Sequence, residues 1–147
     1  MFITLRSNDF YKKIKQDNNF KNKLQKIYGN VIFDKYFIRE GSLFIYYQKD
    51  NVIVASMRIN KKKDIPIYNN FFHIRGVFVN PDFRGQGFCK KIIAHILEIL
   101  QNEKLPIILD VLPDNLPAIS CYKSNNFVEI GKRDIDNIEH ITMIHKK

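Results

Sequence analysis

The sequence predicts one mixed α/β domain spanning residues 1–147, and three observations support this prediction. The length of 147 residues suits a single domain. The composition is 45% hydrophobic and 13% aromatic, which can supply a core and excludes a disordered chain. Segments with strand periodicity alternate with helical segments, in the order β, α, α, β, β, β, α, β, α, β, β.

The N-terminal part is expected to begin with a strand and continue as helix. Residues 2–6, FITLR, have strand character, and Ser7 follows them as a candidate helix N-cap. Weak helical spacing runs over residues 10–28 and stops at Gly29, which can end a helix in the left-handed conformation. Residues 30–40 carry apolar clumps without a clear period, so their structure stays ambiguous.

The middle of the chain predicts strands. Residues 42–60 contain two β-rich runs around the tight polar turn KDN, which indicates a hairpin. Residues 61–70, KKKDIPIYNN, combine a charge run with a proline, and we expect a loop there. Residues 71–80, FFHIRGVFVN, predict a further strand.

The C-terminal half predicts a helix between two strands, then a short helix and a final strand pair. Helical spacing places six apolar side chains on one face: Phe88, Ile92, Ile93, Ile96, Leu97 and Leu100. Residues 106–112 are a continuous apolar run, typical of a buried strand. Residues 114–126 predict a short helix, and two strands joined at Asp136-Asn137 close the chain. A right-handed β-α-β crossover around the long helix follows from this order.

The charge and the ends of the chain restrict the class of protein. The net charge of +9 favours partners such as nucleic acid, membranes or phosphorylated ligands. However, Lys, Asn, Ile, Phe and Tyr all have A/T-rich codons, so an AT-rich genome would explain the lysine excess equally well. The N-terminus lacks the pattern of a secretory signal, and no run approaches the length of a membrane span. We therefore expect a soluble, cytoplasmic protein.

The cysteines and histidines predict neither a disulfide framework nor a metal site. Cys89 lies in the glycine-rich turn and Cys121 in the later helix, and we expect both to be reduced and partly buried. The four histidines are scattered, without metal-ligand spacing.

The turn PDFRGQGF, between a strand and the long helix, has the composition of an anion site. Gly85 and Gly87 let the backbone approach a ligand closely, and the first helical N–H groups have no partners within the helix. Lys90 and Lys91 oppose the helix dipole unless an anion is bound there. A pyrophosphate would suit this turn, although an ordinary strand-to-helix turn would also use glycine.

The same stretch resembles the acetyl-coenzyme A motif of the GNAT superfamily of N-acetyltransferases, Q/R-x-x-G-x-G/A after a V-x-P-type strand end. Arg84 and Gly87 match its first and fourth positions, while Cys89 stands where the family usually has Gly or Ala. Downstream, NLPAISCYKSNNF is similar to the family's N-x-x-A-x-x-x-Y-x-x-x-x-F segment. Asn126 replaces the usual Gly, and asparagine tolerates the left-handed conformation that this position needs.

The resemblance implies a mostly antiparallel central sheet of about six to seven strands, flanked by about four helices. It also implies binding of acetyl-coenzyme A without a metal ion. The backbone of the glycine turn would hold the pyrophosphate, the strand edge at 77–79 would pair with the pantetheine arm, and Asn115 would contact the arm or cap its helix. The implied cofactor-binding residues are Val77, Phe78, Val79, Arg84, Gly85, Gln86, Gly87, Phe88, Cys89, Lys90 and Asn115.

The resemblance also implies direct attack of a primary amine on the acetyl thioester in a ternary complex. A backbone N–H near Phe78 would stabilise the oxyanion, and Tyr122 would donate a proton to the coenzyme A sulfur. A phenol of pKa ~10 is reasonably matched to a thiol of pKa ~8.5. His73 is the best-placed candidate base, Asp110 and Glu40 are weaker candidates, and bulk water would serve if none of them acts.

Several alternatives stay open at this point. The acceptor could be a small molecule or a peptide amine, including an amino sugar phosphate such as glucosamine 6-phosphate. A non-catalytic domain that binds acyl-coenzyme A is the main rival to an enzyme. A nucleic-acid-binding domain ranks last because the lysines are spread along the whole chain. A homodimer also stays open.

Overall fold

The computed structural model describes the backbone of residues 1–65 and 68–146, and the side chains of residues 1–61 and 70–146. Its elements are β1 (Phe2–Arg6), α1 (Ser7–Gln16), α2 (Asn18–Tyr28), η1 (Gly29–Phe33), β2 (Leu43–Lys49), β3 (Val52–Ile65), β4 (Tyr68–Val79), η2 (Pro81–Phe83), α3 (Phe88–Ile99), β5 (Ile107–Val111), α4 (Leu116–Ser124), β6 (Phe127–Ile135) and β7 (Ile138–His145). The mixed α/β prediction is therefore confirmed.

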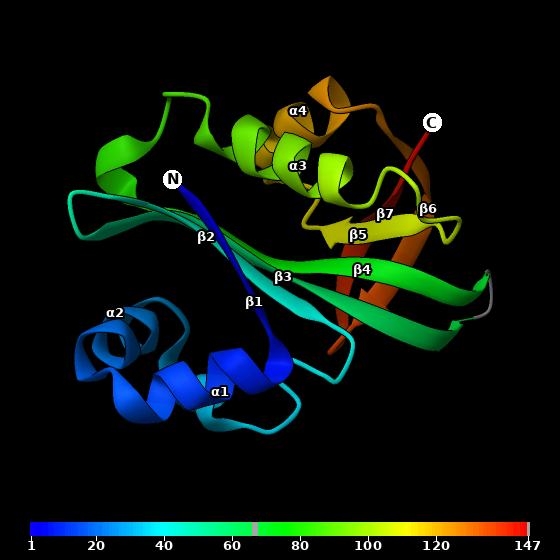
Figure 1. Ribbon diagram of the computed structural model, residues 1–147. Helices are drawn as coiled ribbons and strands as arrows, with labels where there is room; N and C mark the ends of the chain where they lie inside the picture. Colours follow the sequence, from blue (N-terminus) through cyan, green and yellow to red (C-terminus); the bar gives the residue numbers. More distant parts are fainter. Residues whose placement is uncertain (66–67, 147) are drawn as a thin grey trace.

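One sheet of seven strands separates two helical layers. The strand order is β1-β2-β3-β4-β5-β7-β6, and β4 with β5 is the parallel pair in this mostly antiparallel sheet. Helices α1 and α2 cover one face of the sheet, while α3 and α4 cover the other (Figure 1). The helix α3 connects the two parallel strands, as the predicted crossover requires.

Each face of the sheet carries its own hydrophobic core. The core beneath α3 and α4 includes Met57, Ile59, Ile92, Ile96 and Leu109. The core beneath α1 and α2 is rich in aromatic rings, among them Phe10, Phe20, Phe37, Phe44 and Tyr46. Side chains of one strand alternate between the two cores, because successive residues of a strand point to opposite faces.

The N-terminal helical region is two helices, in agreement with the predicted order of elements. Asp17 separates them, and its side chain accepts a hydrogen bond from the Phe20 N–H, which makes it the N-cap of α2. The predicted role of Ser7 is wrong. Ser7 is the first residue of α1 and does not cap it; its hydroxyl donates to the Ile38 carbonyl instead. Gly29 ends α2 at φ +73°, as predicted.

Residues 30–40 form part of a short 3-10 helix followed by irregular chain. Ile32, Phe37 and Ile38 are buried in the core beneath α1 and α2, which explains the clumped hydrophobicity. The structure of this segment is therefore decided by tertiary packing and not by a local hydrophobic period.

The loop predicted over residues 61–70 is wrong for the part that the structure describes. Strands β3 and β4 continue to pair there, up to Ile65 opposite Tyr68, and residues 66–67 lie outside the described backbone. Backbone hydrogen bonds of a hairpin do not require apolar side chains, so a charge run can remain in a strand. The Lys61 ammonium group also lies over the Phe72 ring, 5.7 Å from its centroid.

The predicted polar turns are confirmed by their backbone conformations. Asp50 and Asn51 have φ of 49° and 64°, and Asp136 and Asn137 have φ of 53° and 64°. Two consecutive residues with positive φ are typical of a tight hairpin turn.

Strand β4 contains a bulge that changes its course. Opposite Met57 of β3, the strand holds both Gly76 and Val77, and Gly76 has φ +61°. A Cβ at Gly76 would lie 3.2 Å from a ring carbon of Tyr28 and 3.3 Å from the Nε of Arg58. Glycine is needed here both for the left-handed backbone and for the close approach of these side chains.

We predict that Gly76→Ala lowers the free energy of unfolding by more than about 1 kcal/mol, because it strains the backbone and crowds Tyr28. Gly131→Ala is a matched control, since Gly131 lies in β6 without positive φ and its Cβ would have open space. Urea unfolding of both variants measures the effect. Equal stability of the two variants would contradict the proposed need for glycine in the bulge.

Candidate active site

The parallel strands β4 and β5 pair at one end and separate at the other. Their register covers Phe72 to Ile74 opposite Ile107 to Leu109, whereas β4 continues to Val79 and β5 to Val111. The bulge at Gly76 lies directly after the last pair. The edge of β4 from residue 75 to 79 is thus left without a strand partner on the β5 side, and an extended ligand could pair with it.

The glycine turn connects the open end of β4 to α3. Asn80 opens the turn, accepting a hydrogen bond from the Asp82 N–H, and Arg84 donates through Nε to the Val79 carbonyl at 3.3 Å. Gly85 and Gly87 have φ of +78° and +82°, and a Cβ at either would meet nothing within 4 Å. The space over the turn is therefore open to a ligand, and only glycine adopts this backbone without strain.

The first turn of α3 presents N–H groups to this open space. Gly87 is the N-cap, and the Lys91 N–H makes the first helical bond, to the Gly87 carbonyl. The N–H groups of Phe88, Cys89 and Lys90 precede that bond, so they have no acceptor within the helix. Free N–H groups, a positive helix end and two left-handed glycines are features that fit a pyrophosphate group.

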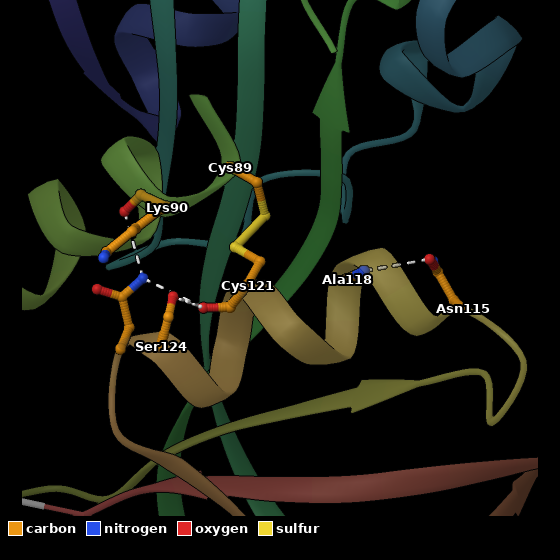
Figure 2. The surroundings of a disulfide bond; sticks show 7 residues. Cys89, Lys90, Asn115, Ala118, Cys121 and Ser124 are labelled. Carbon is orange, nitrogen blue, oxygen red and sulfur yellow. Dashed lines mark hydrogen bonds between the residues drawn. A yellow bond between two sulfur atoms is a disulfide. The ribbon is translucent and has the colours of Figure 1, made fainter. Parts of the chain in front are cut away.

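Helix α4 places Asn115 and Tyr122 near the same region. The Asn115 side chain accepts from the Ala118 N–H at 3.3 Å, so it caps α4 (Figure 2). Tyr122 is 6% exposed and belongs to the core cluster that Val77, Val79 and Phe88 also contact. Five of the predicted residues, Val77, Val79, Phe88, Cys89 and Tyr122, therefore meet in one hydrophobic cluster.

Burial raises the pKa of the Tyr122 phenol to about 12. This value differs from the unperturbed one assumed from the sequence. A phenol of this pKa holds its proton more tightly than a thiolate, whose reference pKa is about 8.5. Tyr122 is therefore suited to donate a hydrogen bond to a thiolate, and complete proton transfer would be unfavourable in this environment.

A disulfide bond joins Cys89 to Cys121, which corrects the prediction of two reduced thiols. The two Cα atoms lie 6.3 Å apart, and the bond connects the first turn of α3 to α4 (Figure 2). The Asn125 side chain reinforces this junction by donating to the Lys90 carbonyl at 3.3 Å. The sequence could not reveal the pair, because 32 residues separate the cysteines and only the fold brings them together.

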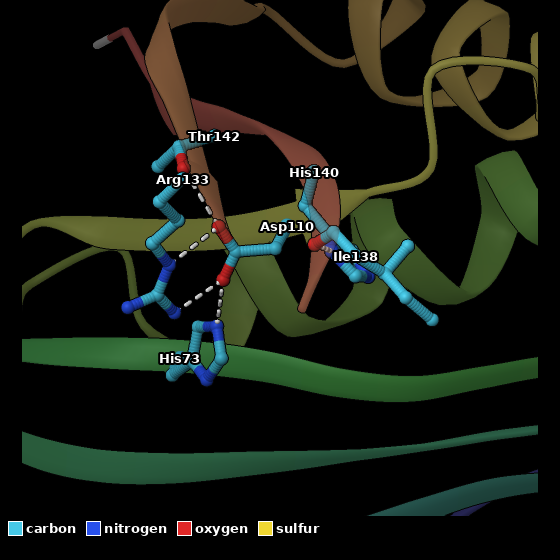
Figure 3. Close-up of polar contacts among 6 residues, drawn as sticks. All are labelled: His73, Asp110, Arg133, Ile138, His140 and Thr142. Atoms are coloured by element: carbon cyan, nitrogen blue, oxygen red, sulfur yellow. Dashed lines mark hydrogen bonds and ion pairs between the residues drawn. The ribbon is translucent and has the colours of Figure 1, made fainter. Parts of the chain in front are cut away.

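His73 and Asp110 form a buried pair where the two strands begin to separate: His73 lies within the paired register, and Asp110 directly follows its last residue, Leu109. The His73 Nε2 lies 2.8 Å from Asp110 Oδ2, and both side chains are at most 5% exposed. Asp110 also accepts two hydrogen bonds from the Arg133 guanidinium and one from the Thr142 hydroxyl (Figure 3). This hub joins β4, β5, β6 and β7.

The hub changes how the candidate bases are interpreted. Burial alone would raise the pKa of Asp110, but hydrogen bonds from His73, Arg133 and Thr142 outweigh it and hold the pKa well below its usual range. Such a carboxylate is a poor base at neutral pH. His73 lies five residues before Phe78, or about 16 Å along the strand. Glu40 is exposed in the segment before β2.

Sequence reasoning missed the polar groups around the bulge. The Tyr28 hydroxyl donates to the Gly76 carbonyl at 2.7 Å and lies 2.6 Å from the Ser56 Oγ. Burial raises the pKa of Tyr28 to about 12. Arg58 packs beside them on the same face of β3. No motif marks these residues, because they come from separate segments that meet only in the folded sheet.

Comparison with known proteins identifies the family. The model of the acetyltransferase (GNAT) family matches residues 6–127, which is most of the chain. The chain belongs to the GNAT family. The match includes the bulge, the glycine turn, α3 and α4.

Individual relatives agree with this assignment. Peptidyl-lysine N-acetyltransferase YjaB of Salmonella typhimurium is 29% identical over 66 residues, which cover 45% of this chain and 43% of that protein. The match thus spans less than half of this relative's length. An acyl-CoA N-acyltransferase from Pseudomonas aeruginosa has the same fold, with a TM-score of 0.71, 16% identity and 99% of each chain covered. Aminoglycoside acetyltransferase AAC(6')-Ib, solved with coenzyme A, gives a TM-score of 0.69 at 14% identity, covering 100% of this chain and 94% of its own.

Within residues 1–61 and 70–146, no group of three or more His, Cys, Asp or Glu side chains is arranged to hold a metal ion. None of the helices in these ranges combines the length and the hydrophobicity that crossing a membrane demands.

The disulfide predicts a redox-dependent stability. Closing a loop of 32 residues should add roughly 3–4 kcal/mol to the free energy of unfolding. Dithiothreitol should therefore lower the denaturation midpoint of the wild type and leave Cys121→Ala, already destabilised, unchanged. Alkylation and mass spectrometry count the free thiols in parallel. Two free thiols in the protein purified without reductant would refute the bond.

The hub predicts a pH-dependent stability. We expect Asp110→Asn to lower the free energy of unfolding at pH 7 by roughly 3–5 kcal/mol, because it breaks a buried charge network. The folded pKa of Asp110 lies below its ordinary value of 3.8, so its contribution is present above that value and declines as the pH falls below about 4. The gap between wild type and variant, measured by urea unfolding, should therefore stay constant above about pH 5 and narrow as the pH falls below about 4. Asp114→Asn, at an exposed carboxylate, serves as control and should show no such change.

Proposed function

We propose that this chain is an acetyl-CoA-dependent N-acetyltransferase that acetylates a primary amine of a small molecule or peptide. The single observation that carries the proposal is the open end of β4 leading into two left-handed glycines at the N-terminus of α3. This arrangement offers a strand edge to an extended arm and free N–H groups to a pyrophosphate, within one continuous turn. Two of the three proteins compared above are named as acting on peptidyl lysine and on aminoglycosides, which both carry primary amines.

In the proposed complex, the chain holds acetyl-CoA at three places. Residues 85–90 bind the pyrophosphate through backbone N–H groups, assisted by the Arg84 side chain. The edge of Val77 to Val79 pairs with the pantetheine arm. Asn115 caps α4 through its side-chain oxygen, and its amide nitrogen is still able to donate to the arm from the opposite side.

The reaction is an acyl transfer from sulfur to nitrogen. The cofactor supplies an acetyl group activated as a thioester. The free amine forms the new C–N bond, the C–S bond breaks, and the amine loses one proton. A backbone N–H near Phe78 donates to the carbonyl oxygen as that oxygen gains negative charge. Tyr122 donates a hydrogen bond to the departing sulfur, which finally takes up a proton.

The acceptor must lose a proton from its ammonium group before it can attack, because only the neutral amine has a free electron pair. Bulk water is able to accept this proton. His73 remains the candidate base from the sequence, and its bond to Asp110 would orient the ring. Its position five residues before Phe78 implies that it would act through intervening water. A supporting role within the hub is the alternative for His73.

Tyr122→Phe separates an enzyme from a domain that only binds acyl-CoA. We expect kcat to fall by at least about tenfold with an accepted amine, since the departing thiolate loses the hydrogen bond that the Tyr122 hydroxyl donates to it. The Kd for acetyl-CoA should change less than about twofold. Thiol release measures turnover, and a thermal-shift titration measures binding, with a shift of several degrees at 100 times Kd. Tyr36→Phe, at an exposed tyrosine, is the matched control.

The outcomes of this experiment are distinct. No thermal shift with acetyl-CoA would refute the whole proposal. A shift without thiol release from any amine, over a panel of amino acids, amino sugars, polyamines and peptides, would favour the binding domain.

A further inference from the structure

Two arginines face each other beside the bulge. Arg58 of β3 is the direct antiparallel partner of Arg75 of β4. Direct partners project to the same face of a sheet. For Arg58 this is the face covered by α1 and α2, because its guanidinium lies 4.2 Å from the centroid of the Phe37 ring.

Arg58 is partly buried and poorly satisfied. Its guanidinium lies over the Phe37 ring, and Nη1 donates one long hydrogen bond, 3.4 Å, to the Phe37 carbonyl. Its Nε is inaccessible to solvent and has no hydrogen-bond partner within the described part of the chain. Burial lowers the pKa of Arg58, and the positive charge of Arg75 lowers it further. A guanidinium nevertheless remains charged at neutral pH, so this site carries an uncompensated cation.

No carboxylate neutralises the pair among the residues whose side chains are described. The ion pairs there involve Lys13, His73, Lys132 and Arg133, and neither Arg58 nor Arg75. Like charges directly opposite one another on a sheet are destabilising, and an unpaired buried charge is costly. An anion bound between the two guanidinium groups would remove both penalties.

A second unsatisfied group lies on the same face of β3. Asn60 is 1% exposed, and its Oδ1 has no hydrogen-bond partner within the described part of the chain. It is two residues from Arg58, or about 6.6 Å along the strand. Buried polar groups are nearly always paired, so this face of β3 holds two exceptions beside each other within the described side chains.

The pair lies next to the proposed reaction centre. Arg75 and Phe78 are on opposite sides of the bulge, three residues apart in β4. Tyr28, at the end of α2, holds the Gly76 carbonyl between them. An arginine side chain is long enough to reach a group on an acceptor whose amine is at Phe78.

We propose that Arg58 and Arg75 bind an anionic group, a carboxylate or a phosphate, of the acceptor amine. This inference rests on the proposed function and gives it a substrate class: small primary amines that carry a negative charge. A guanidinium fork matches the oxygen geometry of both groups. The acceptor is thereby distinguished from polyamines, whose positive charges the two arginines would repel.

Matched pairs of amines test the substrate class by turnover. One pair is glucosamine 6-phosphate with glucosamine, and the other is an amino acid panel with the corresponding amino acid amides. We expect kcat/KM to favour the anionic member of at least one pair by about tenfold or more, as charged hydrogen bonds allow. The two pairs distinguish phosphate from carboxylate. Equal use of both members in both pairs would overturn the inference.

Variants then assign the effect to the two arginines. Arg75→Gln is at an exposed position and should fold normally. It should lower kcat/KM for the anionic amine about tenfold, leave the uncharged amine within about twofold, and leave the Kd for acetyl-CoA unchanged. Arg58→Lys should retain charge but lose the fork, with an intermediate loss. Arg6→Gln, an exposed arginine on β1, is the control. An unchanged preference in Arg75→Gln would refute the assignment.

Phosphate binding, measured as a change in Tm, tests the inference even if no accepted amine is found. Inorganic phosphate, at constant ionic strength and with saturating coenzyme A to fill the glycine turn, should raise the Tm of wild type and Arg6→Gln. The shift should be absent in Arg75→Gln. Equal shifts in all three proteins would overturn the inference. A failure of coenzyme A itself to raise the Tm would instead refute the proposed function.

Discussion

The separation of β4 from β5 is the constraint on which the candidate site depends. A parallel pair would normally continue along its whole length, but the bulge at Gly76 redirects β4 after only three paired residues. The freed edge of β4 then leads directly into the glycine turn and α3. In the proposed complex, three things require this opening: binding of the pantetheine arm, placement of the thioester carbonyl near Phe78, and access for the acceptor amine. The bulge requires glycine at position 76, because Tyr28 and Arg58 occupy the space that a Cβ would need.

Where the two strands begin to separate, a polar network holds them. Asp110 accepts four hydrogen bonds from side chains of β4, β6 and β7, which fixes the position of β5 in the sheet. A network of this kind is costly to bury unless each partner is present. The strands are thus held together as far as Asp110 and separate beyond it. Across the opening, the disulfide between Cys89 and Cys121 connects α3 with α4, the two helices that would flank the cofactor. This covalent bond limits the distance between α3 and α4 independently of the sheet.

Charge distinguishes the two sides of the candidate site. On the side of α3, free N–H groups and Arg84 suit a pyrophosphate, and this follows from the backbone as much as from side chains. On the side of α1 and α2, Arg58 and Arg75 form a second positive site that no local motif encodes. The net charge of +9 suggested anionic partners in general but could not locate them. The uncompensated arginines indicate one specific place where such a charge would act.

The sequence by itself determined the order of the elements, the turns and the cofactor motif. These are local properties: positive φ at Asp50 or Asn137, helical spacing over α3, and glycines at 85 and 87 depend on neighbouring residues alone. Tertiary structure decided the rest. The charged strand ends near Lys61, the buried segment around Phe37, the hub at Asp110 and the cysteine pair all depend on residues far apart in the chain. Burial then set the pKa of Tyr122, because desolvation is a property of the assembled core and cannot be assigned to one residue type.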